Sequence, residues 1–130
     1  MKCILWNVRG LNSPLKQKVL SKLCKEHSCS LIGILESKLD DLRLQQFIGL
    51  HFKGWRHHNN FGNHPNGRIF LLWNPDLIKF QLIEISPQTI TGSITDISSS
   101  LTLTITVVYG LYSVRAVSYT HLTLPTIYSV

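Results

Sequence analysis

The chain has 130 residues, of which 44% are hydrophobic and 15% are charged, and its formal net charge is +6. This size and composition suit a single globular domain with a hydrophobic core and exclude an intrinsically disordered chain. No apolar run approaches the roughly 20 residues of a membrane helix, and the apolar stretch at the N-terminus is too short for a signal peptide. We therefore expect an intracellular protein that does not associate with membranes.

The cysteine count and the basic charge narrow the possible classes further. Three cysteines are present, an odd number, and no two of them form a CxxC pair. This argues against a disulfide framework and against a zinc knuckle. The positive charge favours polyanionic partners through long-range attraction, and it mildly supports a phosphate-bearing substrate.

The first 36 residues predict a strand, a helix and a second strand. Residues 2–8 are expected to form a buried strand. Ser13 and Pro14 are expected to begin a helix, because serine is a good N-cap and proline is favoured at the first helical position. The apolar residues at helical spacing are Leu15, Val19, Leu20 and Leu23. Residues 31–36, with the sequence LIGILE, predict the second strand.

This order of elements places two polar side chains at one edge of a sheet. A strand–helix–strand crossover makes the two strands parallel. Asn7 lies near the end of the first strand and Glu36 ends the second. Because the carboxyl ends of parallel strands meet at one edge, both side chains can face one crevice, where open sheets often bind ligands.

The rest of the chain predicts one short helix followed by antiparallel strands. The helix is expected at residues 39–50, with three apolar anchors: Leu42, Phe47 and Leu50. Apolar residues, period-two alternation and Gly, Pro and Asn turns predict the strands, which are expected at 54–60, 68–75, 77–85, 88–96 and 101–109. The fold class is therefore α/β, opening with a strand–helix–strand unit and continuing with antiparallel hairpins.

Residues 117–130, VSYTHLTLPTIYSV, differ from the rest of the chain. They contain no Lys, Arg, Asp or Glu, and they resemble the adapter tail found on some conceptual translations of transcript reads. We expect a domain at residues 1–116 and a non-native tail at 117–130, which would be left out of fold reasoning. The alternative is a genuine Thr-rich strand and terminus.

Four stretches in this order resemble the endonuclease/exonuclease/phosphatase superfamily, and in particular the N-terminal endonuclease of plant LINE-type non-LTR retrotransposons. The stretches are ILWNVRGLNSP, LIGILESKL, GWRHHNNFGNHPNGRIFLLWNPD and TITVVYG. The resemblance covers residues 1–116, about the first half of such a domain. It implies a partial two-sheet α/β sandwich of the DNase I-like type, with the site at one edge between the sheets. It also implies hydrolysis of a phosphodiester bond with Mg²⁺ or Mn²⁺.

The resemblance further implies which residues act. Glu36 matches the family's metal-binding glutamate, and Asn7 matches the asparagine that helps organise the metal site. Tyr109 matches the tyrosine that contacts the scissile phosphate, and Lys38 matches a supporting basic position. The chemistry agrees, because Mg²⁺ prefers oxygen ligands and takes one or two protein carboxylates. Without the resemblance, Glu36 would be a solvated strand end, Asn7 the start of a turn and Tyr109 a β-core residue.

Other polar residues near these stretches have competing interpretations. Arg9 and Asn12, in the loop beside the predicted site, are candidates for contacting a nucleic-acid backbone. His57, His58 and His64 suggest a metal site, but they lie in a predicted hairpin with no cysteine nearby. A solvated helix face is the simplest interpretation for the lysines of the first helix, namely Lys16, Lys18, Lys22 and Lys25.

Two motifs of the family's later half, Gly-Asp-x-Asn and Ser-Asp-His, do not occur in this sequence. We therefore expect a truncated Mg²⁺-dependent DNA endonuclease of a LINE-like element that is inactive by itself, because a general base is missing. DNA would be the partner of the full-length parent in the nucleus, and no obligate protein partner is expected. The alternatives are a superfamily phosphatase that acts on a small phosphoester and a non-catalytic fragment that binds nucleic acid.

Overall fold

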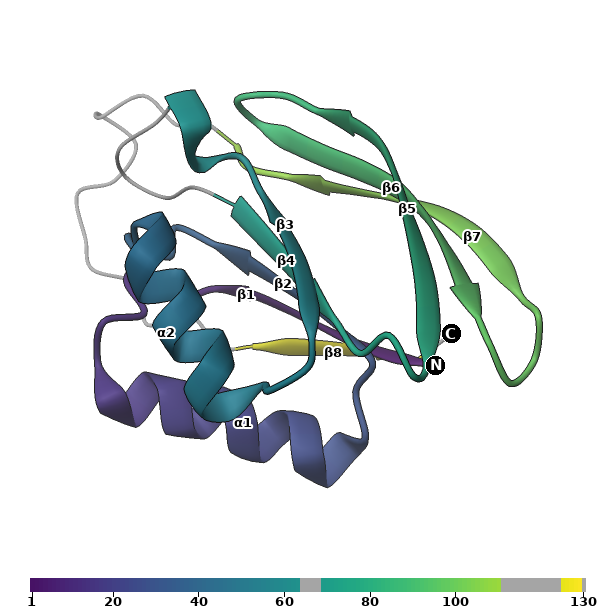
Figure 1. The fold of residues 1–130 in the computed structure, drawn as a ribbon, viewed down its shortest axis with the longest axis horizontal. Coiled ribbons are helices and arrows are strands. Elements are labelled where there is room, and N and C mark those ends of the chain that lie inside the picture. The colour runs from purple at the N-terminus through teal and green to yellow at the C-terminus, as the bar shows by residue number, and fades with distance from the viewer. Residues whose placement is uncertain (64–68, 111–124, 130) are drawn as a thin grey trace.

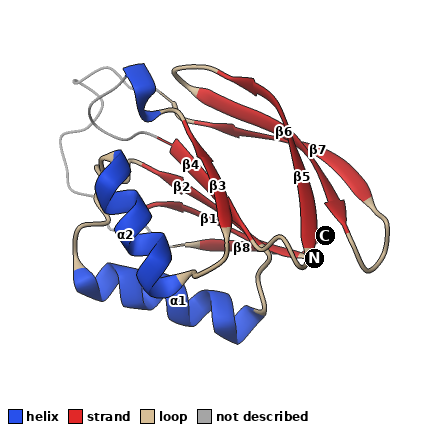
Figure 2. Ribbon diagram, in the orientation of Figure 1, coloured by secondary structure: helices blue, strands red, loops and turns tan. Residues whose placement is uncertain are grey.

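The computed structural model describes residues 1–63, 69–110 and 125–129, and these residues form two β-sheets flanked by helices on one side (Figures 1 and 2). The elements in chain order are β1 (Lys2–Asn7), α1 (Pro14–His27), β2 (Leu31–Leu35), α2 (Asp41–His51), β3 (Arg56–Asn59), a 3₁₀ turn (Phe61–Asn63), β4 (Ile69–Trp73), β5 (Ile78–Ile85), β6 (Thr89–Asp96), β7 (Thr102–Val108) and β8 (Thr126–Ser129). The strands predicted in the second half of the domain are all present, each within a few residues of its predicted bounds.

The first sheet has five strands in the order β3-β4-β2-β1-β8, and the second has three in the order β5-β6-β7. Strands β1 and β2 are parallel, as predicted, with Cys3 opposite Leu31 and Asn7 opposite Leu35. The other described pairs are antiparallel. Helices α1 and α2 cover one face of the five-stranded sheet, and the three-stranded sheet packs on its other face (Figure 1).

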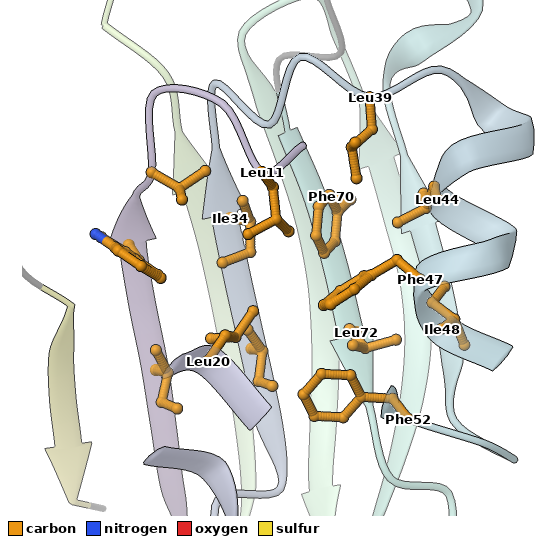
Figure 3. Close-up of a cluster of buried hydrophobic side chains, with 14 of the residues drawn as sticks. Leu11, Leu20, Ile34, Leu39, Leu44, Phe47, Ile48, Phe52, Phe70 and Leu72 are labelled. Carbon is orange, nitrogen blue, oxygen red and sulfur yellow. The ribbon is translucent and has the colours of Figure 1, made fainter. Parts of the chain in front are cut away.

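Strand β4 shows why the five-stranded sheet is the centre of the fold. All five of its residues are buried, as expected for a strand that is covered on both faces. Phe70 and Leu72 point towards the helices and join a core with Ile34 of β2 and Phe47 of α2 (Figure 3). The alternate residues of β4 point the other way, into the second core between the two sheets.

The core between the sheets joins Leu71 of β4 to Ile90 and Ile94 of β6. Gly33 of β2 allows β7 to approach closely at this point. A Cβ atom at Gly33 would lie 3.1 Å from Leu5 Cδ1 and 3.5 Å from Val107 Cγ2. Since β7 leads directly to Tyr109, this close approach helps to determine how near Tyr109 comes to the edge of the first sheet.

The predicted apolar stripe of α1 is only partly correct. Leu20 and Cys24 are buried and Leu23 packs beside them, but Leu15 is 71% exposed and Val19 is 38% exposed. The helix begins as predicted, with Ser13 as N-cap and Pro14 in the first turn. The helical spacing of the apolar residues identified a helix, but it overestimated how wide a face the sheet covers.

Two of the three predicted anchors of α2 are wrong. Phe47 is buried, whereas Leu42 is 64% exposed and Leu50 is 74% exposed. The core positions are Leu44, Phe47 and Ile48, which lie on one face at helical spacing. Apolar residues occur on more than one face of this helix, and the orientation of the helix on the sheet decides which face is buried.

Strand β8 lies within the stretch that the sequence predicts to be a foreign tail. It pairs antiparallel with β1, placing Thr126 opposite Leu5 and Tyr128 opposite Cys3. Ile127 packs against the core beneath the helices. The segment therefore covers one edge of β1 in this structure, while the foreign origin of residues 117–130 stays a prediction.

None of the helices that the structure describes combines the length and the apolar character needed to cross a bilayer. The three cysteines are free thiols, as their number and spacing predict. Burial raises the pKa of Cys3 and of Cys24 to about 11, so both thiols stay protonated and unreactive at neutral pH.

Candidate functional site

The candidate site lies where β1 and β2 end, at one edge of the five-stranded sheet. The predicted placement of Asn7 and Glu36 at this edge is confirmed, because Asn7 pairs with Leu35 and Glu36 follows directly. The ladder continues past the strands and joins the two loops by three backbone hydrogen bonds: Val8 N–H to the Leu35 oxygen (3.1 Å), Gly10 N–H to the Glu36 oxygen (2.7 Å) and Leu11 N–H to the Ser37 oxygen (2.7 Å).

Both loops are held in left-handed backbone conformations. Arg9 has φ 50° and Gly10 has φ 102°, and in the facing loop Glu36 has φ 54° and Lys38 has φ 55°. The prediction that Glu36 is the last strand residue is therefore wrong by one position, since the strand ends at Leu35. Left-handed non-glycine residues cost roughly 1–2 kcal/mol each and persist where the surrounding contacts determine the backbone.

Replacing Lys38 with glycine is expected to raise the free energy of unfolding. Lys38 is exposed, and glycine relieves roughly 1–2 kcal/mol of left-handed strain, offset by about 0.4–1 kcal/mol of added freedom in the unfolded chain. We expect a net gain of about 0.5–1 kcal/mol in urea denaturation. The matched control is Lys18→Gly in the middle of α1, which should lose about 1 kcal/mol. A loss from Lys38→Gly would contradict the strain argument.

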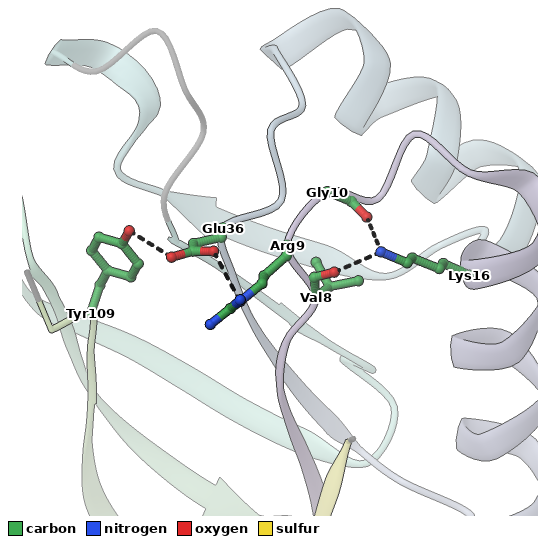
Figure 4. A network of polar contacts seen from close by, with 6 residues as sticks. All are labelled: Val8, Arg9, Gly10, Lys16, Glu36 and Tyr109. Atoms are coloured by element: carbon green, nitrogen blue, oxygen red, sulfur yellow. Dashed lines mark hydrogen bonds and ion pairs between the residues drawn. The ribbon is translucent and has the colours of Figure 1, made fainter. Parts of the chain in front are cut away.

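The carboxylate of Glu36 contacts groups from both sheets (Figure 4). The hydroxyl of Tyr109, directly after β7, donates a hydrogen bond to Glu36 Oε1 at 2.8 Å. Arg9 Nε lies 4.0 Å from Glu36 Oε2, and the side chains of Arg9 and Glu36 are 32% and 27% exposed. The Arg9 Nε atom is buried and makes no hydrogen bond to any residue that the structure describes, and 4.0 Å is too long for one to the carboxylate, so the ion pair is weak. The site thus spans the two sheets and remains open to solvent.

Tyr109 is placed by the second sheet. Its backbone N–H donates to the Gln88 oxygen at 2.8 Å, which ties the end of β7 to the turn before β6. Its ring packs against the apolar core between the sheets. The hydroxyl therefore reaches Glu36 from a fixed position, across 73 residues of sequence.

Replacing Tyr109 with phenylalanine removes this hydrogen bond and keeps the ring. A hydrogen bond to a carboxylate contributes roughly 1.5–3 kcal/mol when buried, so for this partly exposed pair we expect a loss of about 1–2 kcal/mol in the free energy of unfolding. Tyr128→Phe is the matched control, because Tyr128 is 50% exposed, and it should change stability by less than about 0.5 kcal/mol. Equal effects of the two substitutions would show that the Tyr109 hydroxyl contributes nothing specific.

Three other predicted site residues, Asn7, Asn12 and Lys38, lie at the end of β1 or on the rim of the site around Glu36. Asn7 is the last residue of β1, and its Oδ1 atom is buried. Asn12 bridges the rim of the site, donating to the Lys38 oxygen at 3.4 Å and accepting from Arg43 Nη1 at 3.1 Å. Lys38 extends into solvent, so it is the backbone of this residue that contributes to the rim.

The histidines do not form a metal centre in the part of the chain that the structure describes. The ring of His58 on β3 lies 5.3 Å from Trp73 and 5.5 Å from Phe80, measured between ring centres. Burial lowers the pKa of His57 and of His58, which keeps both neutral near pH 7. Residues 1–63, 69–110 and 125–129 contain no group of three or more His, Cys, Asp or Glu side chains arranged to hold a metal. His64 lies outside the described residues.

Two residues near the site were missed by sequence reasoning. Ser37 is fully buried, and its Oγ accepts the N–H of Leu39 at 3.3 Å. Lys16 was predicted on a solvated face, but its Nζ donates to the oxygens of Val8 (3.0 Å) and Gly10 (3.3 Å). The available signal for Lys16 was its place in the first helical turn, next to the loop that carries Arg9.

The donor set, a carboxylate and an amide oxygen, is of the kind that a hard divalent ion prefers. Glu36 offers a carboxylate that is partly exposed at the open edge of the sheet, and Asn7 contributes an amide oxygen near the same edge. Mg²⁺ commonly uses one or two protein carboxylates and keeps several waters, so it needs no larger cluster of ligands. Structural zinc requires four ligands, usually thiolates and imidazoles.

Two solved structures superimpose on most of this chain. The endonuclease domain of TRAS1, a telomere-specific non-LTR retrotransposon, superimposes with a TM-score of 0.56 and 12% identity, over 85% of this chain and 44% of that one. The human Nocturnin catalytic domain, in a structure with a bound sulfate anion, gives a TM-score of 0.54 and 13% identity, over 82% and 48%. The chain has a partial DNase I-like fold.

This result confirms the predicted fold class, including its partial extent. The chain spans less than half the length of either DNase I-like neighbour. No protein-family model and no curated protein matches the sequence. The specific resemblance to plant LINE elements stays a prediction, because similarity at this level of identity shows the fold alone.

Proposed function

We propose that this chain is the N-terminal part of a metal-dependent phosphodiester hydrolase that cuts DNA, with Glu36 as the ligand of Mg²⁺ or Mn²⁺. The observation that supports this best is the Glu36 carboxylate, which is partly exposed at the sheet edge and contacted by Tyr109 from the opposite sheet. The DNase I-like fold supports it further, since one neighbour with this fold is an endonuclease domain.

Each residue of the site has a chemical part in this proposal. Glu36 binds the ion, and Asn7, whose amide both donates and accepts, orders water or carboxylate beside it. A bound Mg²⁺ supplies Lewis-acid stabilisation of the negative charge that develops on phosphate oxygens. The Tyr109 hydroxyl and the Arg9 guanidinium are donors that a phosphate oxygen can use in place of the Glu36 carboxylate. Lys38 and Asn12 lie further out on the rim, where phosphates of the DNA backbone would pass.

We further propose that residues 1–130 do not turn over substrate by themselves. The Gly-Asp-x-Asn and Ser-Asp-His motifs are absent from the sequence, and an enzyme without a general base loses a large part of its rate. A longer parent, a LINE-like element acting in the nucleus, would supply these groups. This agrees with the chain spanning less than half of its structural neighbours.

The proposal is tested by extending the chain. Genomic DNA downstream of the Arg115 codon would be sequenced, and the longer chain that it encodes would be assayed for nicking of supercoiled plasmid. We expect nicking that requires Mg²⁺, stops with EDTA and is lost in Glu36→Ala. If the longer chain contains both motifs and folds, yet does not nick DNA with Mg²⁺ or Mn²⁺, the proposed endonuclease function is wrong.

A second candidate is a phosphatase that acts on a small phosphoester. The neighbour with a bound sulfate anion favours it, because sulfate resembles phosphate in size and charge. The longer chain would then release phosphate from p-nitrophenyl phosphate and leave plasmid DNA intact. A non-catalytic fragment that binds nucleic acid is the third possibility, and it would retard DNA in a gel with no cleavage at any metal concentration.

A further inference from the structure

The ammonium group of Lys16 braces the loop that carries Arg9. Its Nζ lies 3.0 Å from the Val8 oxygen and 3.3 Å from the Gly10 oxygen, so it holds the carbonyls on both sides of Arg9 (Figure 4). Lys16 is half-buried, whereas Lys18 on the same helix is exposed. Two charge-assisted hydrogen bonds to neutral carbonyls are strong and directional, so they restrict the loop more than a solvated lysine would.

The position of Lys16 in the helix makes this arrangement informative. Helix α1 begins at Pro14, so Lys16 is in its first turn. A cation is disfavoured there, because the helix macrodipole places positive charge at the N-terminus. The two loop carbonyls offset this repulsion by accepting from the ammonium group. Lys16 is therefore held by the loop rather than by any preference of the helix.

The opposite side of the same loop is bonded to Glu36. Gly10 N–H donates to the Glu36 oxygen at 2.7 Å, and Leu11 N–H donates to the Ser37 oxygen at 2.7 Å. The side-chain amide of Gln17 adds a bond to the Leu11 oxygen at 2.9 Å. The loop is thus fixed between the first turn of α1 and the residue whose carboxylate contacts Tyr109 and Arg9.

We propose that Lys16 is a positioning residue, whose ammonium group holds the left-handed turn at Arg9 and Gly10 and so aligns the backbone of Glu36 for metal binding. The part about metal binding rests on the proposed function, whereas the part about the loop does not. Two of the three N–H donors of the Lys16 ammonium group are used by these loop carbonyls.

The test compares Lys16→Met, Lys16→Arg and the matched control Lys18→Met in the full 130-residue chain. Amide hydrogen exchange at Gly10, Leu11 and Leu20 reports the loop and the helix separately, and Mn²⁺ titration followed by electron paramagnetic resonance reports the metal site. We expect Lys16→Met to accelerate exchange at Gly10 and Leu11 roughly tenfold relative to Leu20. We expect Mn²⁺ affinity to fall roughly tenfold, as for other residues that orient a ligand. Lys16→Arg should retain most of the exchange protection at Gly10 and Leu11 and most of the Mn²⁺ affinity. Lys18→Met should change neither quantity.

The two readouts separate the two ideas. Unchanged exchange at Gly10 and Leu11 in Lys16→Met overturns the role of Lys16, whatever the metal data show. If Lys16→Met loses protection everywhere, including Leu20, recovery in Lys16→Arg supports the proposal and failure to recover overturns it. If Lys16→Met exchanges faster at Gly10 and Leu11, the bracing of the loop by Lys16 is supported. If the wild-type chain in the same experiment binds no Mn²⁺, Glu36 is not a metal ligand.

Discussion

Glu36→Gln is expected to weaken Mn²⁺ binding more than about tenfold, because it removes the charged ligand and leaves a neutral amide of nearly the same shape. Arg9, 4.0 Å from the Glu36 carboxylate, would then face the ion without a compensating negative charge. The fold should persist, since the amide oxygen of the introduced glutamine can still accept the Tyr109 hydroxyl. Mn²⁺ titration of the folded variant measures the affinity, and a urea transition confirms that the chain is folded.

The matched control for Glu36→Gln is Glu26→Gln. It makes the same change in charge on the exposed surface of α1, where Glu26 pairs only with Lys22 at 3.8 Å among the residues that the structure describes. Its effect on Mn²⁺ affinity should be less than about twofold, because exposed charges are screened within about 10 Å. Equal losses in the two variants would show that overall charge, and not a site at Glu36, attracts the ion.

Phe70→Ala is expected to lower the free energy of unfolding by about 3–5 kcal/mol. Phe70 is completely buried in β4, and its ring lies 6.4 Å from Phe47 and 6.5 Å from Phe61, measured between ring centres. The substitution leaves a cavity at the centre of the core beneath the helices (Figure 3). Since small domains have only about 5–15 kcal/mol of stability, a large fraction of the variant should be unfolded at 37 °C.

The consequence of Phe70→Ala for the site follows from strand pairing. Phe70 lies opposite Ile34 in β2, two residues before Glu36. Loss of this core should therefore reduce Mn²⁺ binding in proportion to the unfolded fraction, and saturating Mn²⁺ should recover part of it.

Leu42→Ala is the control for Phe70→Ala, since Leu42 is 64% exposed, and we expect it to change stability by less than about 0.5 kcal/mol. Chemical denaturation of both variants measures the difference. A cost of several kcal/mol for Leu42→Ala would mean that α2 packs through the face predicted from its sequence and not through Leu44 and Ile48.

Local signals in the sequence were sufficient to locate most of the helices and strands. The apolar run before Asn7, the Ser13-Pro14 helix start and the turn residues that bound the strand predicted at 68–75 each act over a few residues. Strands β1 and β4 and the start of α1 could therefore be located within one or two positions. The parallel pairing of β1 and β2 also followed, because a helical crossover between adjacent strands allows little else. That pairing was enough to place Asn7 and Glu36 at one edge.

Two features could be known only from the tertiary structure, because they depend on contacts between distant segments: the buried face of α2 and the contact between Tyr109 and Glu36. The buried face of α2 depends on where the sheet lies, so spacing alone assigned Leu42 and Leu50 wrongly. The contact of Tyr109 with Glu36 depends on how the second sheet packs on the first, across 73 residues, and no local pattern encodes that packing.

Lys16 shows the same limit over a shorter range. Helical periodicity placed it on a solvated face, but a long flexible side chain can turn back to a neighbouring loop whose carbonyls point towards it. The sequence by itself therefore determined the elements, the parallel edge and the carboxylate at that edge, because these depend on short-range propensities and on chain connectivity. The backbone conformation of Glu36 and the groups that contact its carboxylate were decided by the folded structure, because they require several distant segments to meet at one point.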